Sequence, residues 1–219
     1  MPAPGPGPSL SEEGQRQAEE TARHLASLRA GLPPLAAIYT SPLVRTRETA
    51  GIVGKFLDWA PVERVGLADC DMGEWAGTPL SQLARKPEWA TVLHHPSGFQ
   101  FPGGETITAM QFRVVSTVSA LRALHPGQSI IVVSHADPIK AVLAEALGLH
   151  LDLFQRIDVS PASLSAVAYA SSGPGTPHVM FANWAPSAPV QPTSRPEQPA
   201  SSPALPAEPA PGRAGHQGQ

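Results

Sequence analysis

Apolar residues first recur at helical spacing in the stripe formed by Ala18, Ala22, Leu25 and Leu28. Ser11, ahead of this stripe, is a favourable N-cap, and the two glutamates that follow it suit the positive end of a helix dipole. The Pro33-Pro34 pair cannot continue a helix. This pattern predicts a first helix that begins at Ser11 and ends near Gly31.

Two short apolar runs flank a second helical pattern. Residues 35–39 form a continuous apolar run, which is typical of a buried strand. Ser41-Pro42 offers a serine at the N-cap and a proline at the first helical position, so a helix is predicted from there to about Phe56. Residues 62–65 predict the next strand.

The middle of the chain is irregular between about residues 66 and 104, with short helices predicted near residues 79–93. A longer helical pattern follows the Gly103-Gly104 turn and continues to about Leu124. Pro126-Gly127 ends it, because proline lacks the N–H that a helix needs. We expect this long helix to cover one face of a sheet.

Residues 129–134 give the clearest strand pattern, a continuous apolar run that suits a sheet covered on both faces. Asp137-Pro138 is expected to cap a further helix that ends near Leu147, and closing strands are predicted near residues 163–170 and 178–183. Strands that alternate with helices predict an α/β fold, a doubly wound and mostly parallel sheet with flanking helices.

Composition divides the chain into a Pro/Gly-rich leader over residues 1–8, a domain over residues 9–184 and a disordered Pro/Ala-rich tail over residues 185–219. The net charge of −3 and the pI of about 6.2 give no basic footprint for nucleic acid. Cys70 is the single cysteine, so an intrachain disulfide is excluded. Without an apolar run long enough for a bilayer or a signal sequence, we expect a cytoplasmic protein with no membrane partner.

Two predicted strand-to-helix turns carry candidate chemistry. Arg45 falls in the first turn of one helix, and His135 lies between a strand and the next helix. Ligands of open α/β sheets bind beyond the carboxyl ends of the strands, where helix N-termini attract phosphate. An arginine and a histidine at two such turns therefore indicate a phosphate clamp.

The segments with candidate chemistry, in chain order, are Leu10–Ala18, Ser41–Ala50, Leu67–Gly77, Phe101–Glu105 and Val132–His135. In this order and at this spacing they resemble the motifs of the histidine phosphatase superfamily, the phosphoglycerate-mutase-like enzymes. The resemblance covers about residues 10–184. It implies a phosphoglycerate-mutase-like α/β fold and a small phosphorylated substrate.

The resemblance also implies residue roles. A histidine attacks phosphorus and forms a phosphohistidine, and a carboxylic acid protonates the leaving oxygen. Arg45 and His135 take the clamp positions, Asp69 takes the acid position, and Ala136 stands where the family commonly has a glycine that borders the phosphate. Asp69 is one methylene shorter than the family's usual glutamate. No metal and no cofactor are expected in this scheme.

The family begins with a central strand that ends in Arg-His-Gly and carries the nucleophile, and this strand is expected to be missing here. Arg23-His24 is no substitute, because it falls inside the first predicted helix and lacks the following glycine. Two explanations are open: the natural protein starts upstream, which we favour, or this relative is non-catalytic. Without a central strand, we expect open sheet edges and an exposed core.

The predicted activity is phosphomonoester hydrolysis through a phosphohistidine, with the nucleophile upstream of this chain. The alternatives are a phosphomutase of the same family and a pseudophosphatase that only binds phosphate ligands or proteins. Other residues have weaker or structural interpretations. Arg47 has weaker support for phosphate binding and is alternatively solvated or paired with Glu48, and Asp71 is a weaker rival for the acid role. Glu105, Cys70 and Trp75 are interpreted as structural residues. A variable region over the pocket is expected to be lined by His94, His95, Trp89, Phe99 and Phe101.

Overall fold

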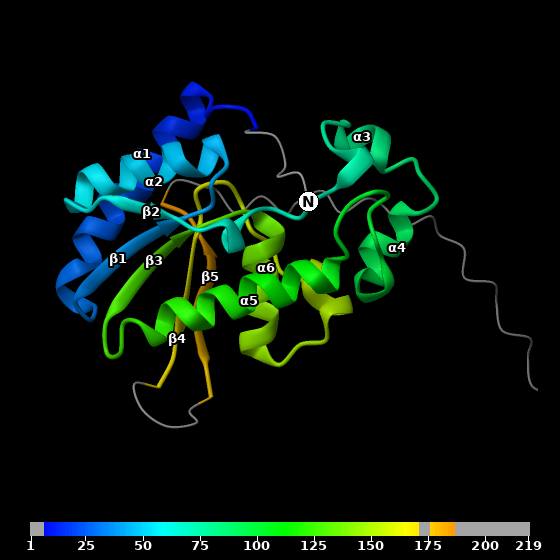
Figure 1. Ribbon diagram of the computed structural model, residues 1–219. Coiled ribbons are helices and arrows are strands. Elements are labelled where there is room, and N and C mark those ends of the chain that lie inside the picture. The colour runs from blue at the N-terminus through cyan, green and yellow to red at the C-terminus, as the bar shows by residue number, and fades with distance from the viewer. Residues whose placement is uncertain (1–6, 171–175, 187–219) are drawn as a thin grey trace, which may run out of the picture. The chain divides into compact units, whose positions relative to one another are not determined.

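The computed structural model describes residues 7–170 and 176–186. Its centre is a parallel sheet of the strands β1 (Leu35–Thr40), β2 (Pro61–Glu63) and β3 (Ser129–Val133) in the order β2-β1-β3. The predicted parallel sheet is therefore confirmed (Figure 1). Strand β2 ends earlier than expected, because Val65 already begins a 3-10 turn that runs to Leu67.

The closing strands form a sheet of their own. Strands β4 (Leu164–Ala168) and β5 (His178–Trp184) pair antiparallel with each other. Within the part of the chain that the structure describes, β3 and β4 are outer strands of two separate sheets. The predicted single sheet is thus divided between β3 and β4.

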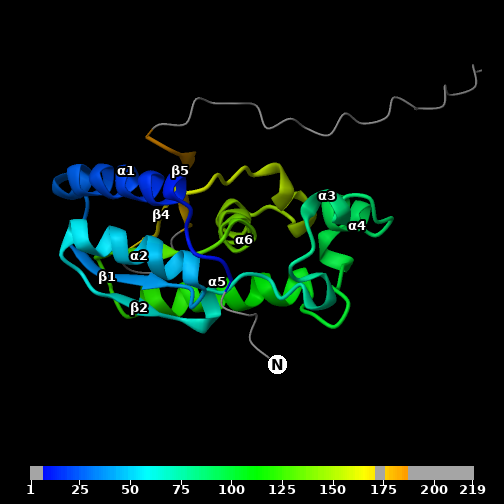
Figure 2. The same cartoon turned by 90° about the horizontal axis from the view of Figure 1, so that it is seen from above.

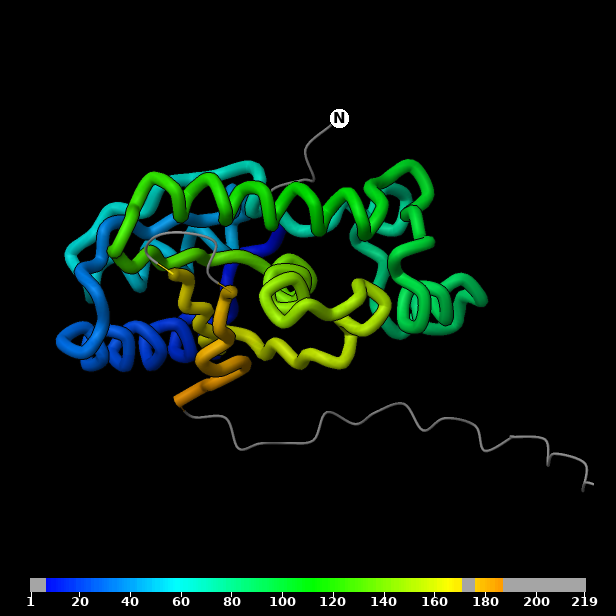
Figure 3. Tube along the Cα trace, turned by 90° about the horizontal axis from the view of Figure 1, so that it is seen from below, coloured from blue at the N-terminus to red at the C-terminus, as the bar shows by residue number. Residues whose placement is uncertain are grey.

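Helices cover both faces of the parallel sheet (Figure 2). Helices α1 (Glu12–Leu28) and α2 (Val44–Leu57) pack on one face. Helices α5 (Ile107–Ala123) and α6 (Ala136–Leu147) belong to the core on the other face, and Figure 3 shows α5 running along that side.

Strand β3 contributes side chains to both cores. Ile130 and Val132 pack against the core of α5 and α6, while Ile131 and Val133 pack against that of α1 and α2. This alternation is the period-2 geometry of a strand with two covered faces. All five residues of β3 are nevertheless only partly buried. The strand is fully apolar after Ser129, yet it lies at the edge of its sheet.

Helix α1 begins as predicted, because the Ser11 side chain accepts a hydrogen bond from the Gly14 amide at 3.1 Å. Its predicted stripe is only partly buried, since Leu28 lies exposed at the helix end. Helix α5 is likewise capped by Thr106, whose hydroxyl accepts from Ala109 N at 3.0 Å. Short polar side chains thus fix both helix starts.

The short helices of the irregular region are α3 (Leu80–Leu83) and α4 (Trp89–His94), as expected. Phe99 and Phe101 belong to the hydrophobic core of this region. They are buried and pack with Trp75, with ring centroids 5.5 and 5.6 Å from the indole. Aromatic rings of this size stabilise a region that has little regular structure.

None of the described helices is long and apolar enough to cross a membrane. Cys70 is buried, and burial raises the pKa of its thiol, as expected for a small structural side chain. Residues 1–6 of the predicted leader, and the predicted tail from residue 187 onward, lie outside the described residues. The disorder proposed for the tail therefore stays a prediction.

Candidate active site

The two turns chosen from the sequence lie side by side. Strands β1 and β3 are parallel neighbours, and their carboxyl ends are joined by the hydrogen bond from Ser41 N to Val133 O at 3.0 Å. Arg45 lies in the first turn of α2, and His135 is the N-cap residue of α6. The sheet therefore brings both predicted clamp residues to one edge.

The three predicted catalytic side chains converge on one nitrogen atom. Arg45 Nη2 donates to Asp69 Oδ2 at 2.8 Å and to His135 Nδ1 at 2.9 Å. Asp69 Oδ2 lies 3.6 Å from His135 Nδ1. Arg45 and Asp69 are each about one third exposed, whereas the His135 side chain is 4% exposed. The site thus opens to solvent on the side of the ion pair.

The neighbours of His135 define its protonation. Arginine has only donors, so Nδ1 of His135 must accept with a lone pair. Nε2 then carries the proton and donates to the buried Ser41 Oγ at 2.8 Å. The ring is therefore neutral and held at both nitrogens.

Electrostatics agrees with this assignment. Burial, together with the positive charges of Arg45 and Arg113, lowers the pKa of His135 to about 3. Burial raises the pKa of Asp69, although Arg45, the Cys70 amide and Arg113 oppose this rise. A carboxyl whose pKa is raised suits a general acid.

Ser41 and Pro42 do not start helix α2, which corrects the prediction. The helix begins at Val44, its N-cap is Leu43, and no side chain caps it. The Ser41 hydroxyl instead bonds His135, and it also accepts from the amide of the N-cap residue Leu43 at 3.4 Å. Similarly, helix α6 begins at Ala136, and Asp137 lies in its first turn rather than at its cap.

The loop that carries Asp69 is held by a residue that the sequence reasoning missed. Arg113 of α5 donates to the carbonyl oxygens of Gly66 and Ala68, both at 3.0 Å, and of Asp69 at 3.2 Å. It also forms two bonds to Glu105, which agrees with the structural reading of that glutamate. The sequence gives no local signal for this pair, because Glu105 precedes the N-cap of α5 and is not a helical neighbour of Arg113.

The remaining candidates lie outside this cluster. Ala136 is exposed as the first residue of α6, and its φ is not positive, so alanine causes no strain there. Arg47 pairs with Glu63 at 3.6 Å rather than with Glu48. Asp71 accepts from the Gly73 amide at 3.0 Å and so shapes a turn.

The adjacent histidines give no metal centre. His95 pairs with Asp152 at 2.8 Å on the surface. Across residues 7–170 and 176–186, His, Cys, Asp and Glu form no group of three or more that could hold a metal ion.

Comparisons with known proteins show the family to which this chain belongs. The family profile "Histidine phosphatase superfamily (branch 1)" matches residues 4–180. Phosphoserine phosphatase 1 of Hydrogenobacter thermophilus is 30% identical over 162 residues, which cover 73% of this chain and 74% of that protein. The uncharacterized phosphatase PhoE of Bacillus subtilis is 27% identical over 161 residues, covering 74% of this chain and 76% of that protein.

A solved phosphatase structure has a similar fold. The structure of mycobacterial glucosyl-3-phosphoglycerate phosphatase Rv2419c matches with a TM-score of 0.69 at 22% identity, covering 81% of this chain and 87% of that one. The chain therefore belongs to the histidine phosphatase superfamily, branch 1. Its relatives include phosphatases, and the sequence resemblance to this family is confirmed.

Replacing Ser41 tests the contact that orients His135. Ser41→Ala removes the buried acceptor of the imidazole N–H, so the free energy of unfolding should fall by about 1–3 kcal/mol in urea titrations. Ser163→Ala is the matched control, because the structure gives that buried hydroxyl no hydrogen-bond partner among the described residues. Equal stability losses in the two variants would contradict the assigned role of Ser41.

Acid should destabilise the protein through His135. Its folded pKa of about 3 lies below the ordinary value of 6.5, so the unfolded chain binds the proton first as the pH falls. Stability should drop between about pH 6.5 and 3, by at most about 1.4 kcal/mol per pH unit. His135→Gln keeps an amide donor and cannot gain charge, so urea titrations at several pH values should show a flatter dependence. Parallel curves for both proteins would contradict this origin.

Proposed function

We propose that this protein hydrolyses small phosphomonoesters through a phosphohistidine intermediate. The observation that carries the proposal is the convergence of Arg45, His135 and Asp69 beside two helix N-termini, at the carboxyl edge of a parallel sheet. The family membership and the phosphatase relatives support this reaction class. Phosphoserine is a reasonable first substrate to test, because one relative is named for it.

In the proposed mechanism, the phosphoryl group replaces Asp69 as the partner of Arg45. Arg45 already projects toward the site and is held by contacts that a phosphate oxygen can take over. A phosphate dianion next to His135 favours the protonated ring, because opposite charge raises the pKa of an imidazole. His135 can then donate from Nδ1 to a phosphoryl oxygen and stabilise charge in the transition state.

Asp69 supplies the proton for the leaving oxygen. Once phosphate displaces its contact with Arg45, Asp69 loses a positive partner and gains a negative neighbour. Both changes raise the pKa of its carboxyl beyond the rise that burial already causes. The acid is therefore protonated when substrate is bound, and the resulting carboxylate can accept a proton from the water that attacks the intermediate.

We further propose that the nucleophilic histidine belongs to sequence upstream of residue 1. Several of the described histidines are engaged elsewhere: His24 stacks on Trp184, His125 bonds Tyr39, and His95 pairs with Asp152. Gly7 lies so close to Arg45 that a Cβ atom there would be 2.8 Å from Nη1. Gly7 therefore lies beside the proposed phosphate clamp.

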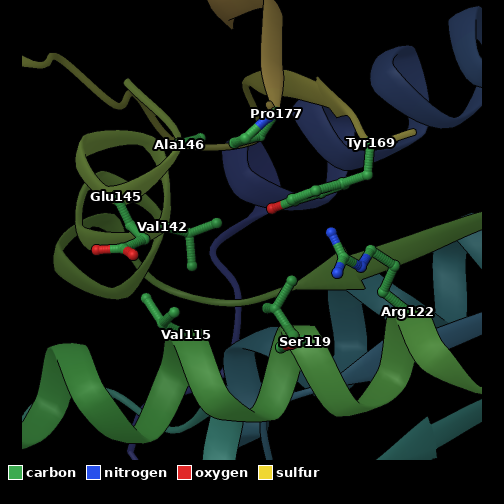
Figure 4. Close-up of a pocket in the computed structure, with 9 residues that line it drawn as sticks. Val115, Ser119, Arg122, Val142, Glu145, Ala146, Tyr169 and Pro177 are labelled. Carbon is green, nitrogen blue, oxygen red and sulfur yellow. The ribbon is translucent and has the colours of Figure 1, made fainter. Parts of the chain in front are cut away.

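The division of the sheet supports the same proposal. The outer strands β3 and β4 can each accept a neighbour, and β3 leaves apolar side chains partly exposed. A cavity of about 260 Å³ lies between α5, α6 and the residues that follow β4 and precede β5, with Val115, Val118 and Val142 among its lining (Figure 4). An apolar strand added between β3 and β4 would form backbone hydrogen bonds with both outer strands and cover the apolar side chains that are partly exposed there.

A phosphomutase and a pseudophosphatase are the alternatives. A mutase must return the phosphoryl group to a second substrate before water reaches it, whereas the open side of the Arg45–Asp69 pair favours hydrolysis. A pseudophosphatase would bind phosphate through Arg45 and His135 without turnover. Turnover by the extended form, tested below, separates an enzyme from a pseudophosphatase.

Turnover should depend on the upstream histidine. The 219-residue chain is expected to hydrolyse p-nitrophenyl phosphate negligibly, while a form extended upstream through an Arg-His-Gly strand is expected to be active. Replacing that upstream histidine by alanine in the extended form is the matched control. Robust turnover by the 219-residue chain that is lost on His135→Ala would contradict the proposed nucleophile.

Phosphate binding should depend on Arg45 even without turnover. Arg45→Met in the present chain removes a charged donor, so the Kd for inorganic phosphate in calorimetry should rise about 10- to 100-fold. Arg47→Met is the matched control, because Arg47 points to Glu63 and should leave binding unchanged. Equal weakening by both variants would show only a general charge effect and would contradict a clamp at Arg45.

A further inference from the structure

All five N–H groups of Arg113 have acceptors. Nε and Nη2 donate to the two carboxylate oxygens of Glu105 at 3.0 and 2.8 Å, a bidentate pair. Nη1 donates to Gly66 O and Ala68 O, and Nη2 also donates to Asp69 O. A guanidinium with every donor used and one fixed plane is a rigid support.

The carbonyl groups that Arg113 binds belong to the loop that presents Asp69. This loop includes the 3-10 turn Val65–Leu67, and among the described residues it has no strand partner that would fix its backbone. The carbonyl left over, Leu67 O, accepts from Ser134 Oγ at 2.8 Å, directly beside His135. Three of these four successive carbonyls are thus tied to α5, and the fourth is tied to the turn that carries His135.

Glu105 fixes the far end of the same loop. Its amide donates to Asp71 O at 2.8 Å, and its side chain accepts from Asp71 N at 3.4 Å. The two loops approach backbone to backbone, since a Cβ atom on Gly104 would collide with Asp71 O. A Cβ atom on Gly73 would likewise collide with Pro102 O. The acid loop is therefore held on both sides of Asp69.

The Asp69 carboxyl is surrounded by charged and titratable groups from three elements. Arg45 approaches from α2, Arg113 from α5, and His135 and Asp137 from α6. The adjacent Cys70 contributes its amide, which donates to Asp69 Oδ1 at 3.1 Å. Arg45 is the member of this set that exchanges partners when phosphate binds in the proposed mechanism, whereas the bonds of Arg113 involve the protein alone.

We propose that Arg113 is a positioning residue for the reaction, and that with Glu105 it holds the Asp69 backbone where the carboxyl can reach the leaving oxygen of the substrate. This inference rests on the proposed role of Asp69 as the acid. Lysine at this position would keep the charge but lose the planar fork, because one ammonium group cannot serve carbonyls and a bidentate carboxylate together. Charge and geometry can therefore be separated.

Leaving-group dependence is the decisive measurement in the extended, active form. A displaced acid should slow the hydrolysis of substrates whose leaving oxygen needs a proton. Arg113→Lys should therefore lower kcat for phosphoserine about 10- to 100-fold. For p-nitrophenyl phosphate, whose leaving group departs as a stable anion, we expect a loss below about 3-fold. Arg122→Lys, on the same helix but stacked on Tyr169, is the matched control and should change neither rate. Equal losses for both substrates, or no loss, would overturn the proposal.

Titration of the 219-residue chain tests the inference without turnover. Carboxyl NMR should show that Arg113→Met raises the pKa of Asp69, because a nearby positive charge is lost, while Arg113→Lys raises it less. Glu105→Gln, a milder change, should alter the chemical shift of the Asp69 carboxyl by releasing the loop. An Asp69 signal that is unchanged in all three variants would overturn the proposal. An extended form without turnover, combined with these shifts, would reject the proposed function but not the support of Asp69 by Arg113.

Discussion

The site depends on a neutral imidazole buried beside guanidinium groups. His135 accepts from Arg45 and donates to Ser41, and this pair of contacts is available only to one tautomer. A protonated His135 ring would be repelled by the positive charges of Arg45 and Arg113, and its burial would deprive that charge of solvation by water. Asp69 is the acidic side chain that pairs directly with Arg45 here. A dianionic ligand relieves the positive charge, and this is the physical basis of phosphate recognition at such an edge.

Parallel strand pairing makes this cluster possible. Arg45 and His135 are 90 residues apart, and no local structure could join them. Because β1 and β3 run in the same direction, their carboxyl ends and the helices that follow them meet on one side of the sheet. The same arrangement lets β3 contribute to both cores, so the stability of the sheet and the geometry of the site have a common origin.

Features encoded locally could be predicted, and features that require a distant partner could not. The cap at Ser11 and the long helix α5 depend on neighbouring residues, and both were expected from the sequence. Ser41 was assigned to the helix start because serine and proline favour it, yet the buried imidazole competes successfully for its hydroxyl. Arg113 was missed because a mid-helix arginine is ordinarily a solvated side chain, and only the tertiary fold brings the acid loop to it. The family motifs indicated which residues meet but not what holds them.

The proposed acid is an aspartate, and this explains why such support is needed. Relative to glutamate, Asp69 has one side-chain torsion fewer, and it cannot search for the leaving oxygen by extending outward. Its reach, shorter by roughly the 1.5 Å of a C–C bond, is therefore set by the backbone. Three carbonyl bonds to Arg113 and the Cys70 amide bond fix that backbone and the carboxyl together. A short acid on a rigid loop loses less conformational freedom in the transition state than a longer acid on a free one.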